Sequence, residues 1–551
     1  MKVLGINAIF HDPAAALVVD GEVVAAAEEE RFSRRKHGKR PVPFSAWETP
    51  DLAARWCLEH AGVRPEDLDA VAYSFDPARH RPAEELGLFD PWDHLRATYA
   101  REAPNFLATA LPGLDPGQVQ FVPHHVAHAA SAALAAPFAG DAAVLVLDGR
   151  GERHSHLAGA YTGGHLAVAA SQDLPHSLGL FWEDVTDHLG FLRSSDEFKV
   201  MALASYGKPR HRGVLREAVH ATGDGGFVTH PVDLGTLAKR REPDDEWTQD
   251  HADLAASLQL VTEELLLDLA TWLRRETGHR DLAFAGGVAL NCVANTRLAA
   301  ESGFRQVWVP PAAGDDGTAL GAALTLAWTG GEPTAPMTGA DLGPGWSDEA
   351  IEAELRRAGV AYRRSPDAAV EAATVLAGDG IVAWYEGRSE FGARALGHRS
   401  LLAHPGREEN LVRLNNVKGR EQFRPVAPMV RAERAAELFS RGPLPSPYMV
   451  FVHDVDPAWR SRIPAVTHVD GTARVQTVDP QTEPHVARML AHFEQLTGLP
   501  VVVNTSLNTA GRPMVDSPRD ALECFGSSPV DLLVLGPFVL HRSWTTVEAP
   551  A

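Results

Sequence analysis

The sequence predicts a mixed α/β protein of two domains, the first of which contains an internal duplication. Short apolar strands alternate with amphipathic helical stretches along most of the 551 residues. A unit of strand, polar loop and hairpin occurs twice in the first half. A segment dense in Pro, Gly and Thr, residues 329–349, is typical of a linker. We therefore expect a first domain at 1–345 and a second at 346–551.

The two copies of the repeated unit carry the same signals. The apolar run at residues 2–10 is short and ends at His11. It therefore predicts a buried strand rather than a signal peptide. Residues 14–30 predict a hairpin that turns at Asp20–Gly21. The second copy has a strand that ends at Asp148, followed by a hairpin that turns at Gly163–Gly164.

The rest of the first domain is predicted to be mainly helical. Residues 51–136 form a helical stretch that Pro and Gly interrupt, and residues 253–277 form one amphipathic helix with a basic end. Residues 281–303 and 306–328 each predict a strand, a Gly-rich turn and a helix. Because α/β folds bind phosphates and nucleotides at such turns, Gly286 and Gly287 are candidate substrate-binding or nucleotide-binding residues.

The second domain is predicted to begin with a short helix and to contain several buried strands. The helix covers residues 348–360. The expected strands lie at 380–387, 448–455, 499–507 and 531–540.

Composition limits the partners that the chain would bind. The formal net charge of −21 repels nucleic acid at long range, so nucleic acid is not expected as a partner. Three cysteines lie far apart without a CxxC spacing, which favours the reduced cytoplasm over a disulfide-stabilised secreted fold. No stretch is apolar over the roughly 20 residues that a membrane helix needs, so we expect a cytoplasmic protein without membrane contact.

Two histidines four residues apart, His124 and His128, form a candidate metal pair. On a helix they would share one face, where neutral imidazoles can bind one divalent ion. A pair of hydrogen-bonded histidines would have the same spacing. Asp148 and Asp315 lie at predicted strand ends and would complete a ligand set that suits Fe²⁺, Mn²⁺ or Zn²⁺. Alone, each aspartate is more often a turn residue or a helix N-cap than a metal ligand.

A basic segment in the second domain is a candidate anion site. Between Arg388 and Arg424, lysines and arginines exceed acids by four, in a chain that is strongly acidic overall. Guanidinium groups suit phosphate and carboxylate, although a solvated helix surface could have the same composition. Glycines beside Arg388 and Arg394 favour a binding loop. Asn504 ends a buried strand, where amides recognise planar polar groups such as a carbamoyl group or a nucleobase.

Several common catalytic motifs are missing from the sequence. It contains no GxxxxGK[ST], GxSxG, HExxH or GxGxxG. Phosphate-loop ATPase, α/β-hydrolase, zincin and standard dinucleotide-binding interpretations therefore lose support.

Nine motifs nevertheless follow one another along nearly the whole chain: FHDPAAALVVDG, AAEEERFSRRKHG, HHVAHAASA, VLDGRGE, FAGGVALN, GDDGTALGAA, GRSEFGARALGHRSLL, FRPVAP and NTSLNTAGRPMVDSP. In content and order they resemble the O-carbamoyltransferase family of natural-product biosynthesis, which includes tobramycin and novobiocin carbamoyltransferases and NodU-type nodulation proteins. The resemblance implies an N-terminal Kae1-like domain of the actin-like superfamily (ASKHA) followed by an α+β YrdC-like domain.

The resemblance also implies a reaction in two steps. The YrdC-like domain would form carbamoyl-adenylate from carbamoyl phosphate and ATP, and the Kae1-like domain would pass the carbamoyl group to a hydroxyl of a small molecule. The family's metal ligands match His124, His128, Asp148 and Asp315, with Fe²⁺ expected ahead of Mn²⁺ or Zn²⁺. Asp316 is the neighbouring alternative to Asp315. Catalytic roles would fall on His11, as base for the acceptor hydroxyl, and on Lys418 and Arg424. Phosphate and adenylate contacts would come from Arg394, Arg474, Asn504 and Lys199.

Two other functions remain open at this point. Kae1-like and YrdC-like domains also occur in the pathway of tRNA threonylcarbamoyladenosine, although the acidic charge counts against tRNA binding. A non-catalytic ATP-binding module of the actin superfamily is the other alternative. The acceptor is not identified, and sugars, aminoglycosides, macrolides and glycopeptides all remain candidates. A homodimer is also left open.

Overall fold

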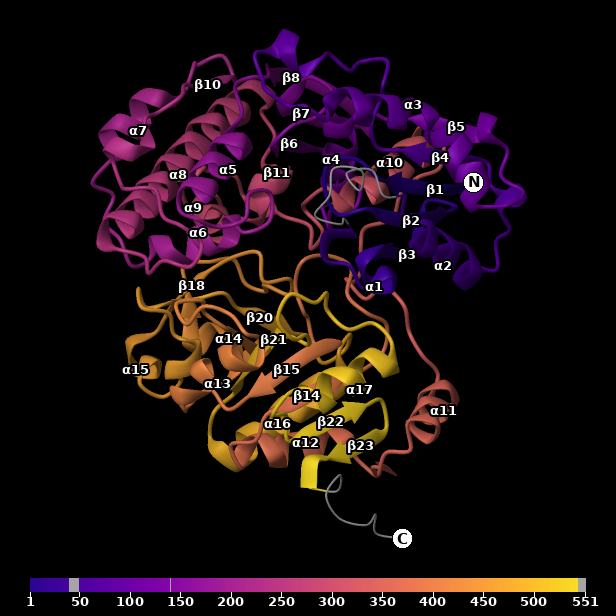
Figure 1. Cartoon of the computed structure of the whole chain (residues 1–551), viewed down its shortest axis with the longest axis vertical. Coiled ribbons are helices and arrows are strands. Elements are labelled where there is room, and N and C mark those ends of the chain that lie inside the picture. Colours follow the sequence, from indigo (N-terminus) through magenta and orange to yellow (C-terminus); the bar gives the residue numbers. More distant parts are fainter. Residues whose placement is uncertain (39–48, 139, 544–551) are drawn as a thin grey trace. The chain divides into compact units, whose positions relative to one another are not determined.

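The computed structural model describes residues 1–38, 49–138 and 140–543. The chain divides into two compact units, Met1–Thr338 and Gly339–Ala551 (Figure 1). Among the described residues, no helix has the length and apolar character that a bilayer crossing requires.

The first unit contains two five-stranded sheets of identical topology. The first sheet has the order β3–β2–β1–β4–β5, with strands β1 (Lys2–Asn7), β2 (Ala14–Val19), β3 (Glu22–Glu28), β4 (Ala70–Tyr73) and β5 (Val119–Phe121). The second has the order β8–β7–β6–β11–β12, with strands β6 (Ala142–Leu147), β7 (His154–Thr162), β8 (His165–Asp173), β11 (Asp281–Ala285) and β12 (Gln306–Trp308). In each sheet the first three strands are antiparallel and the last two run parallel to the central strand. The predicted duplication is therefore confirmed.

The two predicted hairpins turn where the sequence places them. Asp20 and Gly21 have φ angles of 51° and 82°, and Gly163 and Gly164 have φ angles of 55° and 74°. Positive φ at both central residues gives the turn a twist that matches the adjoining strands, which is why Asp-Gly and Gly-Gly are favoured there.

Two helices pack closely against the strands at the centre of this unit. Helix α10 (Asp316–Thr329) lies on β1, and helix α4 (His124–Ala133) lies against α10. A Cβ on Gly5 would come within 1.8 Å of the Ala319 carbonyl oxygen, and one on Gly321 within 1.8 Å of the Ala127 carbonyl oxygen. Glycine is therefore required at both contacts, and the close approach brings the start of α10 beside α4.

Further helices surround these elements. They are α1 (Glu30–Ser33), α2 (Asp51–Ala61), α3 (Asp93–Ala110), α5 (Leu178–His188), α6 (Glu197–Ala204), α7 (Arg212–Ala218), α8 (Gln249–Thr277) and α9 (Cys292–Glu301). A two-stranded sheet, β9 (Val219–Ala221) with β10 (Phe227–Thr229), completes the unit.

The structure corrects two helical predictions in this unit. The predicted helix 253–277 begins earlier, at Gln249, because Thr248 and His251 form a capping box there. The stretch 51–136 is not helical throughout, since it also contains β4 and β5. These strands have only four and three residues, too few for a period-two pattern to separate them from a helix.

The second unit is built on one mixed eight-stranded sheet in the order β13–β23–β22–β14–β15–β21–β16–β20. Its strands are β13 (Arg363–Arg364), β14 (Val382–Tyr385), β15 (Arg399–Ala403), β16 (Ala427–Arg431), β20 (Gln476–Val478), β21 (Val501–Ser506), β22 (Leu532–Leu535) and β23 (Phe538–His541). A small sheet joins β17 (Phe439–Ser440), β18 (His453–Val455) and β19 (Thr472–Ala473). The helices are α11 (Asp348–Ala358), α12 (Ala368–Ala377), α13 (Glu409–Val417), α14 (Ala432–Leu438), α15 (Pro457–Arg460), α16 (Pro484–Thr497) and α17 (Pro518–Gly526).

Two strand predictions in this unit are corrected. Residues 448–455 form a strand only at their end, in β18, because Met449 has a φ angle of 56° that interrupts the extended backbone. Residues 531–540 are a hairpin of β22 and β23 rather than one strand, and the chain turns at Gly536, where φ is 55°. The YrdC-like character of this unit stays a prediction, since its mixed sheet alone does not assign it.

Candidate functional site

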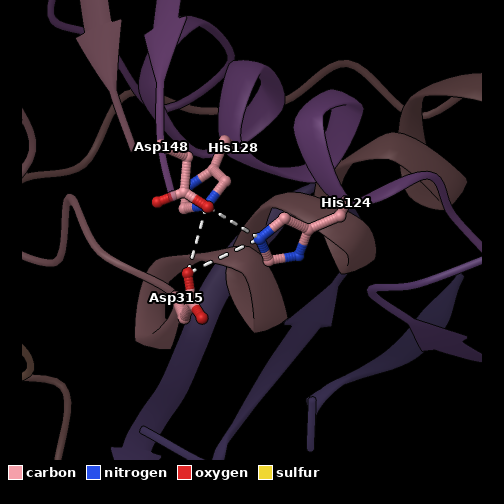
Figure 2. A group of neighbouring side chains, drawn as sticks. All are labelled: His124, His128, Asp148 and Asp315. Atoms are coloured by element: carbon pink, nitrogen blue, oxygen red, sulfur yellow. Dashed lines mark ion pairs between the residues drawn. The ribbon is translucent and has the colours of Figure 1, made fainter. Parts of the chain in front are cut away.

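Four buried side chains from distant parts of the first unit converge on one point (Figure 2). His124 and His128 come from successive turns of α4, Asp148 follows β6, and Asp315 precedes α10. The Nε2 atom of His124 lies 3.4 Å from Asp148 Oδ2 and 3.5 Å from Asp315 Oδ1. The Nε2 atom of His128 lies 3.8 Å and 3.4 Å from the same two oxygens. We call these four residues the His/Asp group.

The spacing of the donor atoms fits a divalent metal ion. Zinc–nitrogen and zinc–oxygen bonds of about 2.0–2.1 Å place tetrahedral ligand atoms about 3.4 Å apart. The Nε2 atoms of His124 and His128 have no hydrogen-bond partner although both side chains are fully buried. Buried imidazole nitrogens without partners are costly, and a metal ion would satisfy both at once. Two imidazoles with two carboxylates suit Fe²⁺, Mn²⁺ and Zn²⁺ alike.

The group is electrostatically complementary without any added ion. Burial alone would lower the pKa of His124, but contact with Asp148 and Asp315 raises it well above its ordinary value. Burial would likewise raise the pKa of Asp148, but contact with His124 and His128 lowers it. Burial and the charge of Asp148 would raise the pKa of Asp315, but contact with His124 and His128 lowers it. Both carboxylates are therefore ionised at neutral pH, which is the protonation state that metal binding needs.

Neighbouring groups orient the ligands. Asp148 Oδ1 accepts the Gly287 N–H at 2.8 Å, and the ring Nδ1 of His124 lies 3.2 Å from the Ser74 carbonyl oxygen. Gly286 has a φ angle of 95°, and a Cβ there would lie 2.1 Å from the Leu147 carbonyl oxygen. The structure thus places the glycine turn against the His/Asp group. That Gly286 and Gly287 also bind substrate stays a prediction.

The structure distinguishes the two neighbouring aspartates. Asp315 belongs to the His/Asp group, as preferred from the sequence, and Asp316 does not. Burial, with the charges of Asp12 and Glu28, raises the pKa of Asp316 well above its ordinary value. Its carboxyl group therefore belongs to another, acidic neighbourhood.

His11 lies in a second cluster on the loop after β1. Asp12 accepts hydrogen bonds on its two carboxylate oxygens, from His11 Nδ1 at 2.6 Å and from His37 Nδ1 at 2.9 Å. The other ring nitrogen of His37 lies 2.9 Å from Ser195 Oγ. A proton on His11 Nδ1 leaves Nε2 as the basic nitrogen, which suits the predicted role of His11.

Sequence reasoning missed Asp12 and His37. The backbone of Asp12 is unusual, since this residue adopts a positive φ angle of 42°. The side-chain amide of Asn7 supports that loop by donating to the carbonyl oxygens of His11 and Asp12. His37 lies about 25 residues further along the chain, so no local spacing could have joined it to His11.

Lys199, the weakest of the predicted substrate contacts, lies at the start of α6. Its ammonium group is 3.0 Å from Asp196 Oδ2 and lies over the Phe191 ring. These contacts account for a structural role, and substrate binding by Lys199 stays a prediction.

In the second unit, Lys418 is held at the end of β21. It follows helix α13, is buried, and donates from Nζ to the Ser506 carbonyl oxygen at 2.6 Å and to Ser506 Oγ at 2.8 Å. It also contacts Asn508 Oδ1. The polar strand end singled out in the sequence therefore positions a lysine.

Asn504 lies inside the same sheet. Its amide nitrogen donates to the Ala395 carbonyl oxygen at 3.0 Å and to Gln476 Oε1 at 2.7 Å. Its Oδ1 is buried without a hydrogen-bond partner. A buried acceptor of this kind is available to a donor on a ligand.

Three guanidinium groups gather near this strand end. Burial, together with the charges of Arg424 and Arg474, lowers the pKa of Arg420 to about 9. Arg474 has a buried Nε without a hydrogen-bond partner. We call Arg420, Arg424 and Arg474 the arginine cluster. Mutual repulsion of this kind is relieved by a bound anion, so the cluster suits a phosphate or pyrophosphate group.

Contacts of two other arginines correct the prediction that the basic segment is an anion site throughout. Arg388 donates to the carbonyl oxygens of Gly343 and Leu342. Arg399 is fully buried, donates to main-chain carbonyls and stacks on Tyr385. The local cationic excess is therefore partly structural, and Arg420, which no motif singled out, is the residue that joins Arg424 and Arg474. Arg394 is half-buried in a turn of the same segment, and its contact with phosphate stays a prediction.

Comparison with solved structures gives only weak similarities. Component A of (R)-2-hydroxyglutaryl-CoA dehydratase from Acidaminococcus fermentans is 16% identical, covering 59% of this chain and 97% of that chain, with a TM-score of 0.33. HypF of T. kodakarensis is 16% identical, covering 60% of this chain and 48% of that chain, with a TM-score of 0.33. Similarities at this level carry no conclusion about this protein.

Sequence relatives are much closer. An uncharacterised protein of Synechocystis sp. is 37% identical over 98% of this chain and 97% of its own length. Nodulation protein NolNO of Sinorhizobium fredii is 37% identical over 98% of this chain and 80% of its own length. Nodulation protein U of Rhizobium tropici is 31% identical over 93% of this chain and 92% of its own length.

Family models cover both units. The model described as Carbamoyltransferase N-terminus matches residues 2–111 and 92–324, and that described as Carbamoyltransferase C-terminus matches residues 373–542. The His/Asp group lies within the residues that the N-terminus model matches, and the arginine cluster lies within those that the C-terminus model matches. The chain therefore belongs to the carbamoyltransferase family and is a transferase enzyme.

Proposed function

We propose that the protein is an ATP-dependent O-carbamoyltransferase that forms carbamoyl-adenylate and transfers its carbamoyl group to a hydroxyl of a small-molecule natural product. The observation that carries the proposal is the distribution of two different sites over the family's two halves. The N-terminal half holds the buried His/Asp group with His11 on a nearby loop, and the C-terminal half holds the arginine cluster with Lys418.

The first half-reaction suits the second unit. Carbamoyl phosphate would lose phosphate to water and leave carbamate, whose oxygen attacks the α-phosphorus of ATP, so that pyrophosphate departs and carbamoyl-adenylate remains. The arginine cluster would bind the negative charge that develops on the departing groups, and Lys418 would neutralise the α-phosphate. Asn504, through its unpartnered Oδ1, would accept a hydrogen bond from the carbamoyl N–H.

The second half-reaction suits the first unit. The acceptor oxygen would attack the carbamoyl carbon, the bond from that carbon to the adenylate oxygen would break, and AMP would leave. An alcohol is a weak nucleophile at neutral pH, so a base is needed, and His11 would take the hydroxyl proton while Asp12 holds its ring. His124, His128, Asp148 and Asp315 would hold Fe²⁺, with Mn²⁺ or Zn²⁺ as alternatives. The ion would act as a Lewis acid toward the phosphate of the adenylate.

The proposed partners follow from charge. We infer a small-molecule acceptor and no nucleic acid, because a chain with a net charge of −21 would have to overcome long-range repulsion to bind tRNA. A homodimer stays a prediction.

The proposal is tested without knowledge of the acceptor. The metal-loaded enzyme is incubated with ATP and carbamoyl phosphate, and pyrophosphate release and carbamoyl-adenylate are followed by mass spectrometry. We expect pyrophosphate release that depends on carbamoyl phosphate. Folded, metal-loaded enzyme that releases none, with or without a panel of hydroxyl acceptors, would contradict the proposal.

A further inference from the structure

His37 has two hydrogen-bond partners, and the proposed function assigns it no role. It lies in the 3₁₀ turn η1 (Lys36–Gly38), where its ring Nδ1 is 2.9 Å from Asp12 Oδ1 and its Nε2 is 2.9 Å from Ser195 Oγ. Asp12 Oδ2 in turn accepts from His11 Nδ1 at 2.6 Å. A chain of three hydrogen bonds therefore runs from His11 through Asp12 and His37 to Ser195.

The carboxylate of Asp12 is held by both histidines. Burial would raise the pKa of Asp12, but His11 and His37 hold it well below its ordinary value, so the carboxylate stays ionised. An ionised carboxylate only accepts hydrogen bonds, so each imidazole donates to it from Nδ1. One such bond leaves the carboxylate free to rotate about its Cβ–Cγ bond, whereas two bonds, one on each oxygen, fix its plane. His37 therefore fixes the acceptor that orients His11.

The backbone is shaped to bring the two imidazoles together. Asp12 and His37 adopt φ angles of 42° and 61°, in the left-handed region that residues other than glycine seldom occupy. Such conformations cost free energy and persist where surrounding contacts impose them, which is typical of functional sites. The Asn7 side chain donates to the carbonyl oxygens of His11 and Asp12, and Glu30 accepts the His37 N–H at 2.6 Å. The centroids of the two imidazole rings are 4.5 Å apart as a result.

Ser195 anchors the far end of the chain of hydrogen bonds. It lies in the loop between α5 and α6, where the Ser194 N–H donates to Glu197 Oε1 at 2.9 Å and so ties the loop to the start of α6. This loop follows the second sheet's hairpin of β7 and β8, whereas His11 follows β1 of the first sheet. Segments that follow both copies of the duplicated unit therefore set the orientation of His11.

His37 is not itself suited to act as the base. Both of its ring nitrogens are engaged, Nδ1 with Asp12 and Nε2 with Ser195. If Nε2 took a proton, the Ser195 hydroxyl would have to reverse its hydrogen bond. The contacts of His37 therefore suit a residue that holds its neighbours in place.

We propose that His37 is a positioning residue for carbamoyl transfer, and that Ser195 is its anchor. His37 fixes the carboxylate of Asp12, and Asp12 keeps the proton of His11 on Nδ1 and the lone pair on Nε2. When the acceptor hydroxyl reacts, its proton passes to His11 Nε2, while the Nδ1–H stays hydrogen-bonded to Asp12 and His37 keeps its own proton. The inference rests on the proposed function, because His11 acts as a base only within it.

Chemical modification of His11 tests the inference without an acceptor. Diethyl pyrocarbonate acylates the unprotonated Nε2 of an imidazole, and an ordinary imidazole is unprotonated at about pH 8. The full-length, metal-loaded enzyme is treated so that each molecule reacts once at most, and the rate at His11 is followed by peptide mass spectrometry. The exposed His165 of β8 is the internal reference. A mixture of tautomers leaves Nε2 unprotonated for only part of the time, so loss of positioning should slow the reaction.

Two substitutions of His37 separate its hydrogen bond from its backbone conformation. Glycine and asparagine both tolerate a positive φ angle, but only asparagine has a side-chain N–H near the place of Nδ1. We expect His37→Gly to slow modification of His11 about fivefold, and His37→Asn to keep the rate within about twofold of wild type. Ser195→Ala leaves His37 without its anchor and should slow the reaction about threefold.

Asp20→Gly is the matched control. Asp20 is another left-handed residue of the same unit, at the turn between β2 and β3, and its substitution should leave the His11 rate unchanged. A His11 rate in His37→Gly that equals or exceeds that of wild type would overturn the inference. An equal loss in His37→Gly and His37→Asn would also overturn it, because the donor would then be irrelevant. If neither His37 variant folds, an unchanged rate in Ser195→Ala overturns it.

A parallel measurement separates this inference from the proposed function. Pyrophosphate release from ATP and carbamoyl phosphate is recorded on the same samples and should stay within about twofold in every variant, since the second unit carries it. Release together with an unaltered His11 rate in His37→Gly would refute the positioning role and leave the proposed function standing. The expected His11 rates without any release would refute the proposed function and leave the chain of hydrogen bonds as the determinant of His11 reactivity.

Discussion

The His/Asp group and the arginine cluster solve opposite electrostatic problems. In the His/Asp group, two imidazoles face two carboxylates in the interior, so opposite charges compensate one another before any ion binds. In the arginine cluster, three like charges gather near a strand end, and burial, together with the charges of Arg424 and Arg474, lowers the pKa of Arg420 although Glu421 opposes the shift. The first arrangement compensates its charges without a ligand but leaves both Nε2 atoms for a metal ion to satisfy. In the second, Glu421 pairs with Arg424, and a bound anion would relieve the remaining repulsion.

This difference indicates how each site should respond to its ligand. The His/Asp group is preorganised, so binding of a metal ion needs little rearrangement. It does require the loss of the proton that His124 keeps because Asp148 and Asp315 raise its pKa. The arginine cluster should gain stability from any anion of suitable shape, and its affinity should depend on pH where Arg420 titrates. Four experiments break or sharpen this contrast.

The largest effect is expected from the double substitution His124→Ala and His128→Ala. Metal content should fall to background, and carbamoyl transfer should fall by about 10³-fold or more because Lewis-acid stabilisation of several kcal/mol is lost. Pyrophosphate release in the second unit should stay within about twofold. His125→Gln changes another buried histidine of α4 that lies outside the group, and it should retain metal. Wild-type metal content in the double variant, measured by elemental analysis, would disprove the ligand assignment.

A smaller loss is expected from His11→Ala. Without its base, transfer to the acceptor should slow by about 10²-fold, while metal content and adenylate formation are unaffected. Asp12→Asn should retain the imidazole but lose the carboxylate that orients it, so the rate should fall less and the pH profile of transfer should shift. Both are measured by following carbamoylated product against pH. An unchanged profile in Asp12→Asn would exclude the orienting role.

Arg474→Met tests the other region. Loss of one of three guanidiniums should reduce kcat/KM for pyrophosphate release by about 10- to 100-fold, with metal content unchanged. Arg519→Met removes an arginine whose side chain is 74% exposed and serves as the matched control. A loss of metal in Arg474→Met would show that the two regions are not independent.

The smallest effect concerns pH. Arg420 is protonated below its pKa of about 9, so the affinity for sulfate should be constant from pH 7 to 8 and fall as the pH rises through about 9. Sulfate does not titrate in this range and reports on the protein alone. Arg420→Met should weaken sulfate about tenfold or less and remove the pH dependence, as measured by calorimetry. A pH dependence that survives in Arg420→Met would assign the titration to another group.

Local signals were sufficient for part of the fold and part of the site. The spacing of His124 and His128 follows from helical geometry alone, and the turns at Asp20–Gly21 and Gly163–Gly164 need only their own backbone preferences. Short strands were less predictable. β4 and β5 each have too few residues for a pattern, and at Met449 a positive φ interrupts a run that is apolar from Tyr448 to Val452.

Long-range assembly decided the remainder of the site. Asp12 joins His11 to His37 across a stretch of chain in which no periodicity applies, and Arg420 became significant only because Arg474, 54 positions away, lies beside it. Conversely, Arg388 and Arg399 looked equal to the other arginines in the sequence, yet they bind main-chain carbonyls. Residue type indicates what a side chain can bind, whereas its neighbours decide what it does bind.

By itself, the sequence determined the duplicated α/β unit, the helical pair of histidines and the position of Asp148 at a strand end, because each depends on periodicity or on turn chemistry within a few residues. The predicted strand-end position of Asp315 is wrong, since Asp315 lies seven residues after β12 as the N-cap of α10. Only the tertiary structure decided that Asp315 and not Asp316 joins the histidines, and which arginines form a cluster. The close packing of α10 on β1 and α4, permitted by Gly5 and Gly321, brings the start of α10 to the histidines. Contacts of this kind join residues hundreds of positions apart, and no local rule encodes them.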